Sequence, residues 1–297
     1  SMLFSSATIL SFSDTLPEHF DDLLANEAFE PCSSFSQSTF GWVSPLPDGF
    51  TDLTRQFGNR VLFCGKREEK VIPTSALQEL ISEKSSQWTN LEGQKPSSKQ
   101  RLQFKEAALS ELLPRALSKH RRILGYIDPA AGLLVINSAS ATDVDTFLNY
   151  LRMTLGTLAV TRIESKQSAG QLFTQWLKRN QPPTGFDLGN ACDLFDPEDG
   201  SSITCRKVAL QSKEILAHLD TGKLCSKLKL TWDQSLSFTL DKDLVLSQIK
   251  YEALTEQADD LDGLEPEIAA LAELDAQFAL LSQELAQLYP KLISVFK

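Results

Sequence analysis

The sequence has few of the residues on which most catalytic and metal-binding motifs depend. Its five cysteines include no CxxC pair, its three histidines are scattered, and no Walker, GxGxxG, GxSxG or HExxH motif occurs. An odd number of unpaired cysteines favours free thiols in a reducing compartment over disulfides or a zinc site. We therefore expect no metal ion and no other cofactor.

Long apolar runs are also absent. No stretch of about 18 apolar residues occurs, so we expect no membrane-spanning helix. The first residues lack the basic start and the long apolar core of a signal peptide, and we expect a cytoplasmic protein. A hydrophobic content of 42% is ordinary for a globular chain, so a sizeable core is expected.

Positive charge is scarce overall, which at first argues against a nucleic-acid partner. The formal net charge is −10, but residues 252–297 contribute −8 of it, and the first 251 residues sum to about −2. Local potential, rather than net charge, decides where a polyanion binds. The distribution of charge is therefore compatible with a DNA-binding surface.

One stretch, residues 94–122, gathers positive charge against only two acids, Glu106 and Glu111. It shows helical periodicity, which Pro114 interrupts. Two interpretations remain open: a solvated helix face, or a surface that contacts phosphates without reading sequence. The basic residues of this stretch are Lys95, Lys99, Arg101, Lys105, Arg115, Lys119, Arg121 and Arg122.

Two further basic sites add weight to the second interpretation. Residues 223–231 read as a strand, and alternation places Lys223, Cys225, Lys227 and Lys229 on one face, with the core on the other. The other site lies at the end of an earlier strand and consists of Lys66, Arg67 and Lys70. Few aromatic residues are interleaved, which favours contact with the backbone of duplex DNA over base stacking.

An enzymatic alternative is a metal-dependent exonuclease. Asp48, Glu68 and Lys70 fit a loose PD…(D/E)xK pattern, in which carboxylates hold Mg²⁺ and the lysine activates water. The pattern is unspecific, because aspartate is common in Asp-Gly turns for its local hydrogen bonding.

Strand and helix signals recur along the chain and predict an α+β protein with mixed or antiparallel sheets and flanking helices. Strands are expected near residues 3–12, 40–43, 60–70, 123–127, 133–138, 158–163, 203–210, 223–231, 236–240 and 244–251. Helices are expected near residues 14–26, 142–155, 168–180, 212–219 and 266–288, with an acidic loop at 256–263.

Two more helices, at residues 75–88 and 97–113, predict a helical hairpin inserted between strands. Ser97 and Gln100 have the spacing of a capping box for the second helix. We expect three domains with the following bounds: a central sheet domain of residues 1–73 and 122–166, a helical finger of residues 74–121, and a base domain of residues 167–297 with a C-terminal helix.

Several short stretches carry a family resemblance. They are residues 29–32 (FEPC), 41–43 (GWV), 66–73 (KREEKVIP), 112–116 (LLPRA), 127–128 (ID) and 222–232. In order and spacing, the chain resembles the RdgC family of bacterial recombination-associated proteins along nearly its whole length.

The resemblance implies a nucleoid-associated protein of the cytoplasm that binds duplex DNA, and more weakly single-stranded DNA, with little sequence preference. It implies a ring-shaped homodimer whose basic central hole admits duplex DNA. Such proteins restrain recombination by limiting the access of the RecA recombinase, which links them to replication fork repair. A basic hole inside an acidic outer surface would reconcile the low pI with DNA binding.

The resemblance also assigns roles to particular residues. Residues 75–113 correspond to a projecting finger, and Leu117 stands where the family places an apolar gate residue of the ring interface. Lys207 and Val208 match the positions that this gate meets across the interface. Leu117 replaces a bulkier aromatic residue and Val208 a polar one, so the strength of gate closure is expected to differ. An exonuclease label attached to the family gains no support from the loose motif above.

Overall fold

The computed structural model describes residues 2–251 and 263–297, so the acidic loop predicted at 256–263 lies, apart from Gly263, outside the described residues. The chain divides into two compact units. Unit 1 comprises residues 1–25, 44–64 and 123–297, and unit 2 comprises residues 26–43 and 65–122.

The first sheet has the strand order β2-β4-β5-β6-β1-β7, with β3 added on β4. Its strands are β1 (Thr8–Phe12), β2 (Ser38–Val43), β3 (Arg55–Phe57), β4 (Arg60–Val71), β5 (Leu117–Asp128), β6 (Leu133–Ile136) and β7 (Val160–Arg162). β1 pairs antiparallel with β6 and β7, β3 with β4, and β5 with β6. All of β6 is buried, as its continuous apolar sequence predicts.

The second sheet lies within unit 1 and has the strand order β12-β11-β10-β8-β9. Its strands are β8 (Phe186–Phe195), β9 (Ser202–Arg206), β10 (Leu224–Trp232), β11 (Leu236–Asp241) and β12 (Leu246–Tyr251). Every neighbouring pair is antiparallel, and β10 is bulged where it pairs with β8. β12 pairs with β11 and not with β10, so β10, β11 and β12 form successive hairpins.

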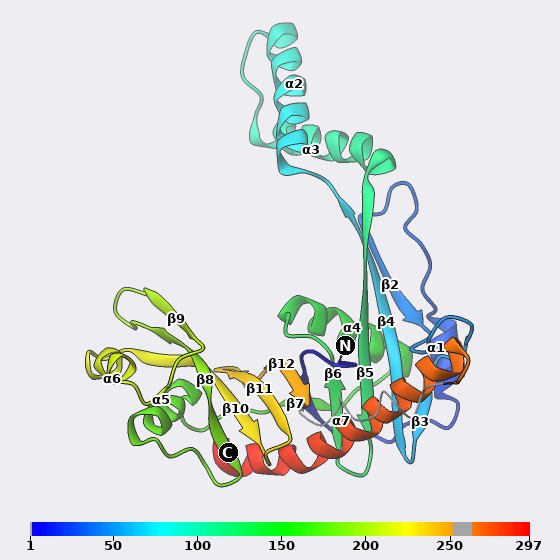
Figure 1. Ribbon diagram of the computed structural model, residues 1–297. Helices are drawn as coiled ribbons and strands as arrows, with labels where there is room; N and C mark the ends of the chain where they lie inside the picture. Colours follow the sequence, from blue (N-terminus) through cyan, green and yellow to red (C-terminus); the bar gives the residue numbers. More distant parts are fainter. Residues whose placement is uncertain (1, 252–262) are drawn as a thin grey trace. The chain divides into compact units, whose positions relative to one another are not determined.

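Helices cover the sheets of unit 1 (Figure 1). They are α1 (Phe20–Asn26), α4 (Ala141–Leu155), α5 (Ala169–Arg179), α6 (Lys213–Asp220) and α7 (Pro266–Phe296). α7 contacts both sheets: Phe278 packs on Tyr126 of β5, and Phe296 packs on Phe173 of α5, which covers β10. The antiparallel bridge between Ala7 and Leu246 joins the chain near β1 to β12, so unit 1 has one continuous core.

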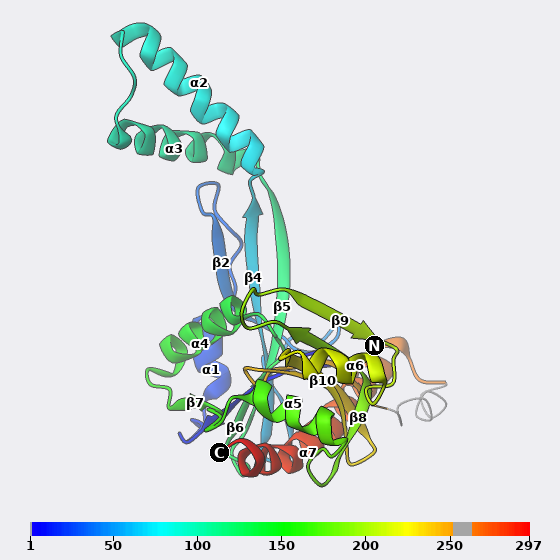
Figure 2. The same cartoon turned by 90° about the vertical axis from the view of Figure 1, so that its left-hand side faces the viewer.

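Unit 2 contains β2, residues 65–71 of β4, residues 117–122 of β5, and a helical hairpin (Figure 2). The hairpin is formed by α2 (Thr74–Glu92) and α3 (Ser98–Leu112), and a 3-10 turn, η1 (Leu113–Arg115), follows it. Gly93 ends α2 in the left-handed conformation, at a φ of 70°. The predicted capping box of Ser97 and Gln100 is present and starts α3.

The predicted α+β class with antiparallel sheets and an inserted hairpin is confirmed, but some elements differ. The helix expected from residue 14 begins only at Phe20. The helix expected from residue 142 begins at Ala141 and is capped by Ser140, whose hydroxyl accepts from the Asp143 N–H. The last helix continues past residue 288, through Pro290, to Phe296, because its apolar side stays buried in the core.

Two strands escaped prediction, and one segment was assigned wrongly. β3 and β8 carry weak alternation and were not predicted as strands. Residues 117–122, expected in a helical arm before a strand at 123, belong to β5, because Pro114 and η1 end the hairpin and β5 pairs beside β4.

Candidate nucleic-acid interface

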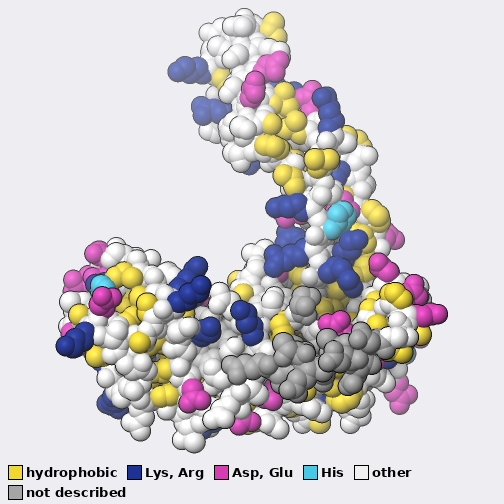
Figure 3. Space-filling model, viewed as in Figure 1, with side chains coloured by type: hydrophobic (Ala, Val, Ile, Leu, Met, Phe, Trp, Pro, Cys, Tyr) yellow, Lys and Arg dark blue, Asp and Glu magenta, His cyan; other side chains and the backbone are white. Residues whose placement is uncertain are grey.

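Residues 115–122, the end of η1 and the first half of β5, carry the densest group of exposed cations in unit 2. Arg115, Lys119, Arg121 and Arg122 are all exposed, whereas Ile123, the next residue, is fully buried. Because strand side chains alternate, Lys119 and Arg121 project from one face of β5 and Arg122 from the other. Arg115 precedes the strand, in η1. We call these four residues the basic segment. Figure 3 shows lysine and arginine side chains gathered along β4 and β5.

The cations of the hairpin are also exposed but more widely spaced. Glu106 and Glu111 lie among them on α3. The Glu111 carboxylate oxygen Oε2 forms an ion pair with Lys84 Nζ of α2, at 3.2 Å. The hairpin therefore has an alternating charge pattern, and its basic character is weaker than that of the basic segment. The exposed hairpin cations are Lys95, Lys99, Arg101 and Lys105.

Lys70 holds the backbone together and does not project into solvent. Its Nζ donates to the carbonyl oxygens of Ser33 at 2.9 Å, Ser34 at 3.2 Å and Leu113 at 3.1 Å. An ammonium group has three N–H donors, so these contacts use its full capacity. Lys70 thus ties the loop before β2 to the end of the hairpin, which is a structural role.

Lys66 and Arg67 precede it on β4. The Lys66 ammonium lies 4.8 Å from the centre of the Phe29 ring, a cation–π contact. The Phe29 N–H donates to the Trp42 carbonyl oxygen at 2.9 Å, and any side chain at Gly41 would collide with the Phe29 backbone. The resemblance motifs around residues 29–32 and 41–43 therefore share one packing function: they fix this loop against β2.

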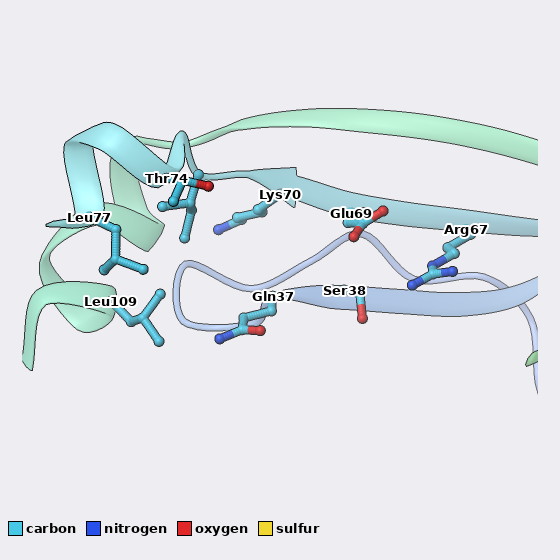
Figure 4. A pocket seen from close by; sticks show the side chains of 9 residues that line it. Gln37, Ser38, Arg67, Glu69, Lys70, Thr74, Leu77 and Leu109 are labelled. Carbon is cyan, nitrogen blue, oxygen red and sulfur yellow. The ribbon is translucent and has the colours of Figure 1, made fainter. Parts of the chain in front are cut away.

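Arg67 and Lys70 line a cavity of about 290 Å³ at the base of the hairpin (Figure 4). Glu69 lies between them on β4, and Leu77 and Leu109 of the hairpin line the other end. The mixture of both charges and apolar walls gives this cavity no clear preference for an anion.

A second cavity, also of about 290 Å³, is mostly apolar. Leu117 lines it and is 82% exposed, which is unusual for a large aliphatic residue. Its other lining residues are Val71, Ile72, Pro73, Leu112, Arg115 and Ala116. An exposed leucine beside an apolar hollow is a feature of contact surfaces.

Glu68, the acid of the alternative nuclease motif, is buried and already occupied. Its Oε1 accepts from the Cys32 backbone N–H at 3.2 Å, and its Oε2 accepts from the Ser118 hydroxyl at 2.8 Å. These hydrogen bonds, led by that of Ser118, lower the pKa of Glu68. Among residues 2–251 and 263–297, no group of three His, Cys, Asp or Glu side chains is arranged to hold a metal ion.

The lysine row of β10 differs from the sequence-based expectation. A bulge between Cys225 and Lys227 breaks the alternation, so Cys225 is fully buried with the core residue Leu228, while Lys227 is exposed. Lys223 precedes the strand. The expected face of Lys223, Cys225, Lys227 and Lys229 is therefore wrong as a single row.

Acidic residues on the two neighbouring strands lie beside Lys227. The sequence of β10 alone does not reveal them. The cross-strand partners of Lys227 are Asp193 on β8 and Asp241 on β11. Burial raises the pKa of Asp241, and the nearby Lys227 charge opposes that rise. Opposite charges in directly paired positions attract, so the positive potential over Lys227 is reduced.

Sequence reasoning missed Asn190, which has no motif around it. Its side-chain oxygen accepts from Lys229 Nζ at 3.4 Å, and its backbone oxygen accepts from the Val208 N–H at 3.1 Å. Lys207 adopts a φ of 53°, in the left-handed region. Predicting β8 would have placed Asn190 beside β10, but its weak alternation gave no such signal.

The fold and its exposed cations define a mixed α+β protein with a basic edge, and comparison with known proteins identifies its family. The family model described as "Putative exonuclease, RdgC" matches residues 2–297. The chain belongs to the RdgC family, as its sequence motifs predicted. None of the helices in the described ranges is long and apolar enough to cross a membrane.

Curated relatives agree with this family. The chain is similar to the "Recombination-associated protein RdgC" of Aeromonas hydrophila, at 35% identity over 99% of this chain and 97% of the relative. It is 34% identical to the protein of that name from Halorhodospira halophila, over 94% of this chain and 92% of the relative. The corresponding protein of Tolumonas auensis is 33% identical, over 99% of this chain and 97% of its own.

Proposed function

We propose that this RdgC-family protein binds DNA, mainly duplex, without sequence preference, and restrains RecA-dependent recombination without enzymatic activity. The observation that carries the proposal is the basic segment, whose four cations are exposed at the end of η1 and along the first half of β5. Such a segment suits contact with phosphates, which carries little sequence information. The curated relatives are named recombination-associated proteins, which supports a role in recombination. A nucleoid location is part of the same proposal.

We further propose that two copies form a ring around the duplex. Leu117 with its apolar cavity suits one contact surface, and Lys207 and Val208 are proposed to meet it across the interface. In the same proposal, residues 74–121 act as a finger, residues 1–73 and 122–166 as a central domain, and residues 167–297 as a base. The proposed DNA contacts besides the basic segment are Lys66, Arg67, Lys95, Lys99, Arg101, Lys105, Lys223, Lys227 and Lys229.

The alternative, a metal-dependent exonuclease, has the printed description of the family model in its favour. The proposed residues argue against it, because both oxygens of Glu68 accept hydrogen bonds and all three donors of Lys70 are used. Incubation of labelled duplex with Mg²⁺ or Mn²⁺ separates the two functions. Shortening of the DNA that Glu68→Ala abolishes would favour the nuclease.

Charge reversal in the basic segment tests the main proposal. Arg115→Glu with Lys119→Glu should weaken duplex binding at least about 30-fold near 0.15 M salt, since each lost phosphate contact removes about 0.9 from the salt exponent. Fluorescence anisotropy with duplexes of different sequence measures this, and all should be affected alike. The matched control reverses Lys178 and Arg179, exposed on α5. Equal affinities for the two double variants would remove the basic segment from the interface.

A further inference from the structure

Three of the five cysteines meet at one place in the second sheet, although they lie far apart in the sequence. Cys192 is on β8, Cys205 on β9 and Cys225 on β10. Cys192 lies directly opposite Cys205 in the pairing of β8 with β9, and Cys225 lies opposite Leu194, two residues further along β8. All three are free cysteines in unit 1, and the proposed DNA binding gives them no role.

The backbone positions of Cys192 and Cys205 suit a disulfide. The two residues are direct partners in the antiparallel pairing of β8 with β9. Directly opposite residues have Cα atoms about 4.5 or 5.5 Å apart, and disulfides span Cα distances of about 4.4–6.8 Å. Because directly opposed side chains leave the same face of the sheet, the bond requires rotation of side chains and no shift of strands.

Cys225 is held differently. Its register partner on β8 is Leu194, and the bulge after it directs its side chain into the core. Its N–H donates to the Thr174 hydroxyl at 2.9 Å, and its thiol donates to the Lys227 carbonyl at 3.1 Å. The Cys225 thiol proton is thus used on the Lys227 carbonyl, and Cys205, not Cys225, lies directly opposite Cys192, which favours Cys205 as the disulfide partner.

The thiols of Cys192 and Cys205 differ in solvent access and in pKa. β9 is an edge strand, and Cys205 is only partly buried, whereas Cys192 is 3% exposed. The neighbouring thiols of Cys225 and Cys205 lower the pKa of Cys192, which favours its thiolate form, whereas burial and the nearby Cys192 raise the pKa of Cys205. An accessible thiol beside a buried, thiolate-prone one has the layout of a pair that is oxidised and then closed.

We propose that Cys192 and Cys205 are a thiol-oxidation site that forms a reversible disulfide when the protein meets a hydroperoxide. The Cys205 sulfur attacks the peroxide, the O–O bond breaks, and a sulfenic acid forms. The Cys192 thiolate then attacks that sulfur, the S–O bond breaks, and the S–S bond forms. Two thiols and one hydroperoxide give one disulfide, one water and one alcohol, or two waters when the oxidant is hydrogen peroxide.

The bond would fasten the edge strand β9 to β8. Lys207 and Val208 follow β9 directly, and Val208 already donates its N–H to Asn190 of β8. Oxidation would therefore place a covalent link beside the segment proposed for dimer contact. The disulfide itself does not depend on that proposal.

The sequence makes the test direct. No lysine or arginine lies between Arg179 and Arg206, so trypsin releases Cys192 and Cys205 on one peptide, residues 180–206, and Cys225 on another, residues 224–227. The full chain is treated with hydrogen peroxide, denatured with an alkylating agent, digested and measured by mass spectrometry. We expect peptide 180–206 mainly as an unalkylated form lighter by two hydrogens, with Cys32 and Cys64 alkylated.

Controls assign the partners. Dithiothreitol should restore the alkylated peptide, Cys205→Ser should abolish the lighter form, and Cys225→Ser should retain it. Cys205 is only partly buried on an edge strand, so its serine variant is expected to fold. The proposal is overturned if peptide 180–206 remains alkylated at both cysteines in the oxidised wild type, or if it is found linked to peptide 224–227.

Discussion

At the scale of single residues, charge alone does not define an interface. Lys70 and Glu68 both sit in a stretch that suggests DNA contact or catalysis, yet both satisfy the backbone of their own unit. Lys70 binds carbonyl groups that come from the loop before β2 and from η1, and Glu68 joins Cys32 to Ser118. Polar groups buried in this way must be paired, which explains why each is held by several partners.

The pH dependence of stability tests the role of Glu68. Its pKa in the folded protein lies below the ordinary value of 4.5, so its contribution to stability is full above that value and is lost as the pH falls through the folded pKa. Glu68→Gln should therefore lower the free energy of unfolding at neutral pH and differ progressively less from the wild type in acid. Urea unfolding between about pH 3 and 7 measures this.

Glu69→Gln, at an exposed position of the same strand, is the matched control. It should shift the unfolding curve little at any pH. A wild type and a Glu68→Gln variant that differ by the same amount at every pH would contradict a stabilising charge at Glu68.

At the scale of elements, local patterns predicted most of the fold and failed where tertiary contacts decide. Ser97 with Gln100 predicted the start of α3 and the apolar run Leu133–Ile136 predicted a buried strand, because each signal depends on neighbours in sequence. Residues 117–122 of β5 are rich in charge and have no apolar alternation, so they form a strand because they pair with β4. The bulge at Cys225 is likewise set by β8.

The lysines of β10 should matter less for DNA binding than the basic segment does. Lys227 lies opposite Asp193 and Asp241 in the strand pairing, and Lys229 donates a hydrogen bond to Asn190. Charge reversal at both lysines should weaken duplex binding by a smaller factor than Arg115→Glu with Lys119→Glu, measured by anisotropy in the same buffer. A loss of DNA affinity as large as that of the basic-segment variant would show that Asp193 and Asp241 do not reduce the positive potential of these two lysines.

At the scale of the whole molecule, the acidic composition and the proposed DNA partner are compatible, because the acids concentrate late in the chain. The sequence predicted the family and the candidate cations. It did not predict which cations have polar neighbours that the fold brings to them. Lys70 donates to the carbonyl of Leu113, and Lys227 lies opposite Asp241, and both neighbours are distant in sequence. The exposed Leu117 became informative only with the apolar cavity beside it.

Leu117→Ser tests the proposed dimer contact. Leu117 is 82% exposed, so the substitution should leave the free energy of unfolding of one copy almost unchanged. If both copies bury this leucine, the dimer loses about 3 kcal/mol or more, which weakens association on the order of 100-fold. Sedimentation equilibrium measures this change. Leu91→Ser, at a residue 85% exposed on the hairpin, should dimerise as the wild type does. Identical dimerisation of the Leu117 and Leu91 variants would exclude this contact.

The most direct test of the account is a binding titration of linear and closed-circular duplex DNA across a range of salt concentrations, with Mg²⁺ present. The mass of each complex and the length of the DNA are measured at every step. We predict that the logarithm of the affinity falls steeply and linearly with the logarithm of the salt concentration, that two copies occupy the duplex, and that the DNA stays intact. Affinity that does not change with salt, or DNA that shortens when Mg²⁺ is present, would contradict a non-enzymatic protein that holds duplex DNA through its phosphates.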